Sequence, residues 1–119
     1  MIEILPETKG NVVGLRLAGK IGASDYEEML PEFDRIVSNY AEVRIMLDWE
    51  DLEGWTEEGE SFRFFISTSY RRFDIMRIAI VGGEKWRSES ESVKEIVRSD
   101  VRLFDPADRE AAWSWLKND

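Results

Sequence analysis

The sequence predicts an α/β fold with a mixed, mostly parallel sheet of about five strands and about four helices, in the order ββαβαβαβα. Short apolar runs typical of buried strands alternate with longer segments in which apolar residues recur at helical spacing. A short connection containing Pro6 and Gly10 separates the first two runs, which indicates an antiparallel hairpin at the N-terminus. The 119 residues contain no linker and no repeat, so we expect residues 1–119 to form a single domain.

The N-terminal part is expected to form two strands and a helix. The apolar runs Ile2–Leu5 and Asn11–Gly19 are the two strands of the hairpin. A helix is predicted to begin at Ser24, because Ser24 and Glu27 have the spacing of a capping box and apolar residues follow on one face. Pro31 lies inside this helix and is expected to kink it or to divide it into two pieces.

The centre of the chain predicts two strands that are buried on both faces. Val43–Leu47 and Met76–Val81 are nearly continuous apolar runs, which is typical of inner strands of a parallel sheet. Residues 48–55 are expected to be a loop after the first of them. A second helix is predicted over 56–72, with Thr56 as its cap and carboxylates in its first turn, and a weaker third helix over about 84–99.

The C-terminal part predicts one more strand and one more helix. Val101–Phe104 is a short apolar run, and Asp105 followed by a proline is typical of a helix start. The core face of this last helix is marked by Ala112, Trp115 and Leu116. Trp113 is expected to point elsewhere and is assigned, with Phe64, to a surface contact.

Composition excludes several classes of function. The chain has no cysteine and no histidine, so thiol chemistry is excluded and the usual general base at neutral pH is absent. The formal net charge of -9 disfavours nucleic acid and anionic lipid as partners. We find no signal peptide and no apolar stretch long enough to span a membrane, and therefore expect a soluble, cytoplasmic and non-enzymatic protein.

Short motifs spread over nearly the whole chain point to a known family: Met1–Pro6 with Gly10–Val12, Asp25–Glu27 with Pro31, Gly54–Thr56, Arg77–Gly82 followed by Lys85 and Trp86, and Val101–Asp105. Together with the order of elements, these motifs resemble the SpoIIAA-like family of the STAS superfamily. Its sheet and helices have also been likened to the CRAL-TRIO lipid-binding fold. The resemblance implies a binding domain with no cofactor.

The resemblance also implies that a phosphorylation switch is missing. Anti-sigma-factor antagonists of the superfamily carry an Asp-Ser-Ser-Gly motif at the start of the second helix, where phosphorylation of a serine breaks partner binding. The motif falls on Thr56–Gly59, and Glu57 and Glu58 stand in place of both serines. These carboxylates either reproduce part of the charge of a phosphate or simply complement the positive end of the helix dipole.

In similar proteins, the segment after the fourth strand holds aromatic and apolar residues proposed to bind apolar ligands or to approach membranes. Here the segment 82–92 keeps only Trp86 as an apolar anchor among several glutamates. Because anionic lipid would repel these glutamates, contact with a membrane is the weaker alternative, and a partner protein or a small apolar ligand remains.

Three tryptophans are expected at one edge of the sheet. Trp49, Trp55 and Trp86 sit at or just beyond predicted strand ends, where wide amphipathic rings can line a pocket or anchor a partner. The alternative is that Trp55 and Trp86 are lids packed on the core, as large aromatic side chains commonly are.

Four carboxylates crowd the loop that contains Trp49. Asp48, Glu50, Asp51 and Glu53 could hold Mg²⁺ or Ca²⁺, although their spacing is not that of an EF-hand loop. A solvated acidic loop is the simpler interpretation, and we assign no metal ligand and no catalytic residue.

The function predicted from sequence is therefore binding at one edge of the sheet. The edge is built from the 48–58 loop and the 82–92 segment, and its residues are Trp49, Trp55, Thr56, Glu57, Glu58 and Trp86. The expected occupant is a partner protein or a small, lipid-like apolar ligand, and a homodimer is a further alternative. The alternative function is a divalent-metal-dependent enzyme that uses the carboxylates of residues 48–53.

Overall fold

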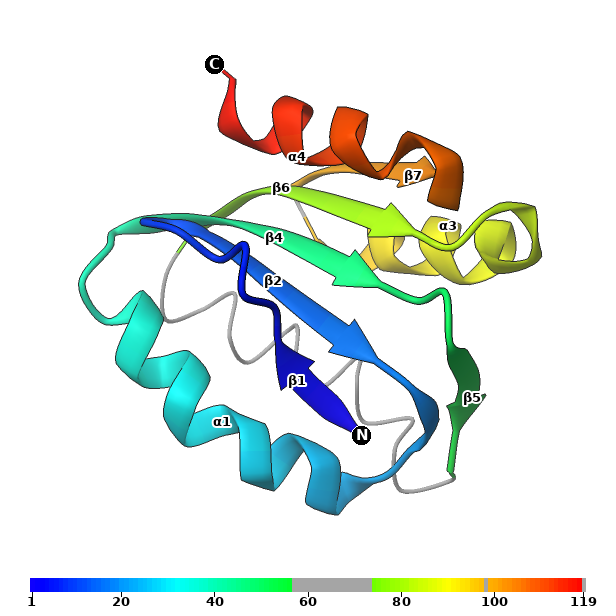
Figure 1. Cartoon of the computed structure of the whole chain (residues 1–119), viewed down its shortest axis with the longest axis horizontal. Coiled ribbons are helices and arrows are strands. Elements are labelled where there is room, and N and C mark those ends of the chain that lie inside the picture. Colours follow the sequence, from blue (N-terminus) through cyan, green and yellow to red (C-terminus); the bar gives the residue numbers. More distant parts are fainter. Residues whose placement is uncertain (57–73, 98, 119) are drawn as a thin grey trace.

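The computed structural model describes residues 1–56, 74–97 and 99–118, which form an α/β structure with helices on both faces of a sheet (Figure 1). The second helix expected over 56–72 falls almost entirely outside these residues. The described elements, in chain order, are β1 (Ile2–Ile4), β2 (Val12–Leu17), β3 (Gly19–Ile21), α1 (Ala23–Val37), β4 (Glu42–Asp48), β5 (Leu52–Trp55), β6 (Asp74–Val81), the 3-10 helix η2 (Glu84–Trp86), α3 (Arg87–Ile96), β7 (Asp100–Phe104), the 3-10 helix η3 (Pro106–Asp108) and α4 (Arg109–Lys117).

The main sheet confirms the predicted mixed arrangement. It has five strands in the order β1-β2-β4-β6-β7. The hairpin partner β1 is antiparallel to β2, and all other neighbours are parallel. A row of residues in register across the parallel strands, Val13, Ile45, Ile78 and Val101, is buried, because helices cover this face. The carboxyl ends of the parallel strands consequently meet at one edge of the sheet.

A second sheet of two strands corrects two expectations. The apolar run over residues 11–19 is not one strand: β2 ends at Leu17 and the chain turns at Gly19, whose φ of 71° lies in the left-handed region that favours glycine. After this turn β3 pairs in parallel with β5, which lies within the segment expected to be a loop. The N–H of Thr56 donates to the carbonyl of Ile21 at 2.9 Å and closes this small ladder.

Two apolar clusters lie on the two faces of the sheet. The larger packs α1 and α3 on one face, with Phe33 and Ile45 fully buried among its members. The smaller packs α4 on the other face around Met46 and Leu116. Figure 1 shows α1 and α4 on opposite sides of the sheet. The inner strands β4 and β6 contribute side chains to both clusters, as their continuous apolar runs predict. None of the described helices combines the length and the apolar character that a membrane span requires.

The start of α1 differs from the predicted capping box. The N-cap is Gly22, and the carboxylate of Asp25 accepts a hydrogen bond from the N–H of Gly22 at 2.8 Å. The pair Ser24 and Glu27 had the right spacing, but Asp25 lies closer to the free backbone donors. Pro31 lies inside α1, which continues through it as one helix to Val37.

The two tryptophans of α4 exchange their predicted places. Ala112, Trp113 and Leu116 are buried, whereas Trp115 is only partly buried. The reason lies on β2: a Cβ added to Gly14 would stand 2.7 Å from Cη2 of Trp113, so the ring occupies the space that the glycine leaves. The predicted surface role of Trp113 is therefore wrong.

Candidate functional site

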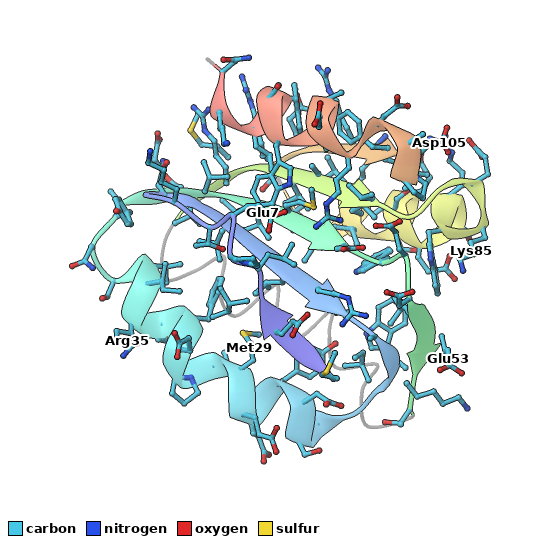
Figure 2. The ribbon with its side chains drawn as sticks, viewed as in Figure 1. Glu7, Met29, Arg35, Glu53, Lys85 and Asp105 are labelled. Carbon is cyan, nitrogen blue, oxygen red and sulfur yellow. The ribbon has the colours of Figure 1, made fainter. Side chains whose placement is uncertain are left out.

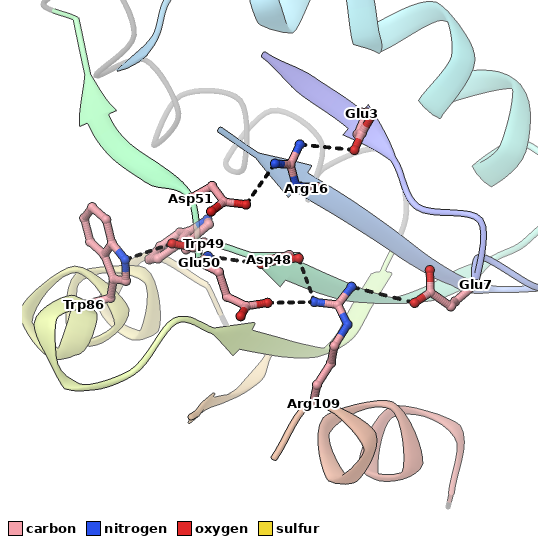
Figure 3. A network of polar contacts seen from close by, with 9 residues as sticks. All are labelled: Glu3, Glu7, Arg16, Asp48, Trp49, Glu50, Asp51, Trp86 and Arg109. Carbon is pink, nitrogen blue, oxygen red and sulfur yellow. Dashed lines mark hydrogen bonds and ion pairs between the residues drawn. The ribbon is translucent and has the colours of Figure 1, made fainter. Parts of the chain in front are cut away.

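The candidate site lies where β4 and β6 end side by side. From β4 the chain passes through Trp49 towards β5, and from β6 it passes through Gly82 and Gly83 into η2. The N–H of Trp49 donates to the carbonyl of Val81 at 2.8 Å. In the other direction, the indole N–H of Trp86 donates to the carbonyl of Trp49 at 3.0 Å, as Figure 3 shows. These two bonds join the two segments that the sequence predicts to form one edge.

The three predicted tryptophans contact one another edge to face. The ring centroids lie 5.5 Å apart for Trp49 and Trp55, 5.6 Å for Trp49 and Trp86, and 6.0 Å for Trp55 and Trp86. These separations and the steep interplanar angles are those that aromatic pairs prefer. Trp49 is fully buried and Trp86 is 9% exposed, whereas Trp55 is partly exposed. We call these three residues the tryptophan cluster.

A tyrosine from α1 completes the cluster. The indole N–H of Trp55 donates to the hydroxyl of Tyr26 at 2.9 Å. Burial raises the pKa of the Tyr26 hydroxyl above its ordinary value of 10.0, so this group stays neutral and can accept the bond over the whole physiological range. Tyr26 is absent from the predicted site because it lies in a different element, where its helical spacing marks it only as a core residue.

The interior of the tryptophan cluster is filled by its own rings. A Cβ at Gly82 would lie 2.6 Å from Cδ1 of Trp86 and 3.2 Å from Cβ of Trp49. Contacts this short are not tolerated, so even one methyl group has no room there without a shift of the rings. The tryptophan cluster therefore supports the backbone of the edge. Only its outer surface, chiefly the ring of Trp55, can contact another molecule.

The acidic residues between Asp48 and Glu53 are not uniformly solvated, which corrects the interpretation of this segment as a solvated acidic loop. Asp48 is the last residue of β4 and is only 4% exposed. One of its carboxylate oxygens accepts from the N–H of Glu50 at 3.0 Å, and the other pairs with the Arg109 guanidinium at 2.6 Å (Figure 3). Arg109 also pairs with Glu50 at 3.2 Å and with Glu7 at 3.7 Å. A cation supplied by α4 thus compensates the buried charge.

A second arginine holds the next carboxylate. Arg16 of β2 pairs with Asp51 at 2.8 Å and with Glu3 at 3.2 Å. Asp48, Glu50 and Asp51 therefore face guanidinium groups that compete with any metal ion. Across residues 1–56, 74–97 and 99–118, the acidic side chains form no group suited to holding a metal ion. Neither arginine is recognisable from sequence as part of the site, since Arg109 is 61 positions away from Asp48.

The outer rim of the site is polar. Glu53 of β5 and Lys85 of η2 are exposed and point away from the ribbon in Figure 2. The Lys85 ammonium lies 5.6 Å from the centroid of the Trp86 ring, within the range of a cation–π contact. Thr56 is exposed, and its backbone closes the β3–β5 ladder. Glu57 and Glu58, the remaining predicted site residues, lie outside the described residues.

A five-stranded mixed sheet with helices on both faces, and an edge built at the carboxyl ends of its parallel strands, defines an open-sheet α/β domain. Its sequence matches the SpoIIAA-like family over residues 12–117. The chain belongs to this family.

Two solved structures have a similar fold. An uncharacterized protein from Shewanella loihica PV-4 with a SpoIIAA-like fold aligns with a TM-score of 0.79 and 20% identity, over 97% of this chain and 93% of that one. The anti-sigma factor antagonist SpoIIAA, in its unphosphorylated form, aligns with a TM-score of 0.64 and 12% identity, over 99% of this chain and 100% of that one. No curated protein matches the sequence.

Proposed function

We propose that this chain is a cytoplasmic, non-enzymatic binding domain that engages a partner protein at the edge formed by the 48–58 loop and the 82–92 segment. The observation that carries the proposal is the tryptophan cluster: buried rings fix the edge, and the partly exposed Trp55 is surrounded by exposed charged groups such as Glu53 and Lys85. An aromatic anchor within a polar rim is typical of protein interfaces. SpoIIAA, a structural neighbour, is named as an antagonist of an anti-sigma factor.

The packing favours a partner protein over a small apolar ligand. A small ligand would need an enclosed apolar space, but the three rings contact one another and leave no room for a methyl group beside Gly82. A partner needs only the outer surface of Trp55 and the rim. In this proposal Glu57 and Glu58 supply fixed negative charge where phosphorylated relatives carry serines, so partner or ligand concentration regulates binding instead of phosphorylation.

Site-specific photo-crosslinking tests the proposal. We would place a photoreactive phenylalanine at Glu53 or Lys85 on the rim, and at Glu28 or Glu32 of α1 as controls, since all four side chains are exposed. The expected result, in cells of the source organism, is a crosslinked protein of one defined mass from the rim positions only. Equal yields from all four positions, or none from the rim, would contradict the proposal.

Native mass spectrometry of the freshly purified chain tests the apolar-ligand alternative. A protein that carries a lipid-like molecule should show an added mass of that size, and substitution of Trp55 by Ala should remove it. We expect the mass of the chain without such an addition, because the rings of the cluster fill their own interior.

A thermal-shift screen with Mg²⁺, Mn²⁺ and Ca²⁺ tests the metal-dependent enzyme. Any ion that binds only the native state must raise its apparent stability, by roughly 2.7 kcal/mol at a hundredfold excess over the dissociation constant. We expect no shift at millimolar metal, because Arg109 and Arg16 already pair with the carboxylates of Asp48 and Asp51. A shift abolished by Asp48→Asn would favour the enzyme instead.

A further inference from the structure

The outermost strand of the main sheet, β7, has an open lateral side, which differs from the binding edge at the carboxyl ends of the strands. In the order β1-β2-β4-β6-β7, strand β7 pairs with β6 on one side, and no other described strand lies on its outer side. An edge strand presents backbone donors and acceptors that another chain can use.

The hydrogen-bonding direction of each residue in β7 follows from one contact. The carbonyl of Phe104 accepts from the N–H of Gly82 at 3.1 Å, so it points towards β6. Successive residues of a strand direct their backbone groups to alternate sides, and Arg102 and Asp100 therefore also point towards β6. The N–H and C=O groups of Val101 and Leu103 point outward, and no backbone group of the described residues outside β7 and β6 bonds to them.

The side chains of β7 carry opposite charges on one face. Asp100 and Arg102 are two residues apart, so they share a face, and their side chains are 55% and 56% exposed. They form only a long contact of 3.7 Å within their own strand. Charged side chains, lysines above all, commonly protect an edge strand from pairing. A negative and a positive charge at this spacing instead make the edge complementary to itself.

The complementarity selects one register. If two β7 strands pair in antiparallel fashion about Val101, Asp100 stands opposite the partner's Arg102, and Arg102 opposite the partner's Asp100. Both contacts are non-hydrogen-bonded pairs, in which side chains approach most closely. The neighbouring register, centred on Arg102, sets two guanidinium groups against each other and is disfavoured.

Aromatic side chains lie beside this edge on the same face. Trp115 of α4 is partly buried and contacts Phe104, with ring centroids 5.9 Å apart. The guanidinium carbons of Arg102 and Arg77 lie 4.7 Å and 5.4 Å from its ring centroid. The exposed portions of Trp115 and Phe104 supply the apolar surface that a second copy would cover.

We propose that two copies of this chain associate through antiparallel pairing of their β7 strands, in the register centred on Val101, which continues the main sheet across the dimer. The occupant of the edge is a second copy, because antiparallel pairing of β7 with another β7 places Asp100 of each copy opposite Arg102 of the other. This surface is separate from the tryptophan cluster, so the dimer and the proposed partner binding can each fail independently.

Sedimentation velocity of the full chain tests the dimer through charge reversal. A short ladder gives a weak complex, so loading concentrations run from about 10 µM to about 1 mM. The wild type is expected to dimerise in this range. Asp100→Arg and Arg102→Glu each place like charges opposite each other and should weaken dimerisation by at least about tenfold. The double variant D100R/R102E restores opposite charges and should recover it.

An equimolar mixture of the two single variants is the most specific arm. One partner then carries only positive charges at these positions and the other only negative charges, so the mixture should form a heterodimer. Native mass spectrometry with one variant isotopically labelled detects it. Glu32→Arg and Arg35→Glu, an exposed pair on α1 with the same charge changes, are matched controls expected to dimerise like the wild type. Circular dichroism checks that every variant is folded.

The proposal would be overturned by a wild type that stays monomeric up to the highest concentration, by dimerisation unaffected by both single reversals, or by a mixture that does not associate. Loss of dimerisation in the α1 controls as well would also overturn it, because the effect would then follow net charge rather than the β7 edge.

Discussion

At the scale of single residues, the ion pair of Asp48 and Arg109 stands out because it holds a buried charge. Both carboxylate oxygens of Asp48 are used, one by the N–H of Glu50 and one by the guanidinium. The pair joins the carboxyl end of β4 to the first turn of α4, which come from distant parts of the chain. Taking two charges out of water costs free energy, so such a pair adds little net stability. Removing only one of the partners is nevertheless strongly destabilising, because the other charge is then buried without compensation.

Removing one partner of this pair should therefore be costly. We expect Arg109→Met to lower the free energy of unfolding by about 2 kcal/mol, somewhat less than for a fully enclosed pair because Arg109 keeps 27% of its side-chain exposure. Glu50→Gln, which removes an exposed partner of the same arginine, should change it by no more than about 0.5 kcal/mol. Urea denaturation measures both. Equal effects of the two substitutions would show that the charge of Asp48 does not need Arg109.

A second single residue, Asp25, stabilises the start of α1 through its carboxylate. Its hydrogen bond from the N–H of Gly22 holds the pKa of Asp25 below the ordinary value of 3.8. Because the pKa is lower in the folded state, the charged form adds stability that is fully present above pH 3.8 and is lost as the pH falls through the folded pKa.

Asp25→Ala should consequently destabilise the protein by about 1 kcal/mol at pH 7, as expected for a lost capping interaction. The difference from the wild type should shrink below pH 4, when Asp25 takes up a proton. Thermal unfolding of both proteins between about pH 7 and pH 3 measures this difference. The lowered pKa of Asp25 in the folded state requires that the difference decrease, and not increase, as the pH falls. A difference that stayed constant or grew in acid would contradict the assigned role.

At the scale of elements, the position of α4 depends on the absence of a side chain on β2. Trp113 and Leu5 approach Gly14 so closely that a Cβ there would lie 2.7 Å and 2.9 Å from their nearest atoms. The C-terminal end of α4 is held by two arginines from the sheet. Arg44 donates to the carbonyl of Leu116 at 2.7 Å, and Arg77 donates to that of Trp115 at 2.6 Å. Cations at the negative end of the helix dipole are favourable there.

Gly14→Ala should therefore lower the free energy of unfolding by about 1–3 kcal/mol, the usual cost of overpacking a core. Trp113→Leu alone should also destabilise, because it leaves a cavity, but it should relieve the clash in the Gly14→Ala background. A double-mutant cycle by chemical denaturation measures this coupling, which is expected to be favourable by at least about 0.5 kcal/mol. Strictly additive effects would show that Trp113 and Gly14 are not in tight contact.

The elements that sequence predicts well are those with their own periodic signal. The inner strands β4 and β6 are long apolar runs, so the sequence predicts the bounds of both to within two residues. The short strands β3 and β5 contain Gly19 and Gly54 and exist only because they pair with each other, which no local pattern indicates. Likewise, helical spacing admits either Trp113 or Trp115 to the core, and the choice is made by Gly14 on another element.

The residues of the candidate site also fall into two groups, those that the sequence predicts and those that only the fold brings together. The sequence predicts that the three tryptophans share an edge, because strand ends of a parallel sheet meet there, and the ring contacts show that the three residues lie together. The sequence does not predict the arginines that pair with the acidic segment. Arg16 and Arg109 reach it from β2 and α4, and only the folded topology brings them there.

At the scale of the whole molecule, the pairing of arginines within the fold leaves the negative field implied by the net charge of -9 in place. Four arginines direct their charge to groups within the fold: Arg16 and Arg109 to carboxylates, and Arg44 and Arg77 to carbonyls at the end of α4. Their positive charge is largely neutralised at short range. The overall field therefore disfavours nucleic acid and favours partners with a basic surface.

Stability should also be unevenly distributed between the two sheets. Strands β4 and β6 lie in the middle of the main sheet and are covered on both faces, whereas the β3–β5 ladder is short and carries the exposed residues Lys20 and Glu53. Elements with few buried contacts open at a lower free energy than the global unfolding transition.

Amide hydrogen exchange at increasing denaturant should resolve this difference. We expect the slowest amides in β4 and β6, at the free energy of global unfolding. The ladder amides of β3 and β5, including the N–H of Thr56 bonded to Ile21, should exchange through a local opening with little denaturant dependence and a free energy lower by a few kcal/mol. Because Trp55 is part of β5 and packs on Trp49, Trp55→Ala removes contacts that both the local opening and global unfolding break, and should lower the protection of the ladder and of β6 by a similar free energy. Equal protection of both sheets would show that the tryptophan cluster unfolds only with the core, and the proposed binding edge would then be as rigid as β4 itself.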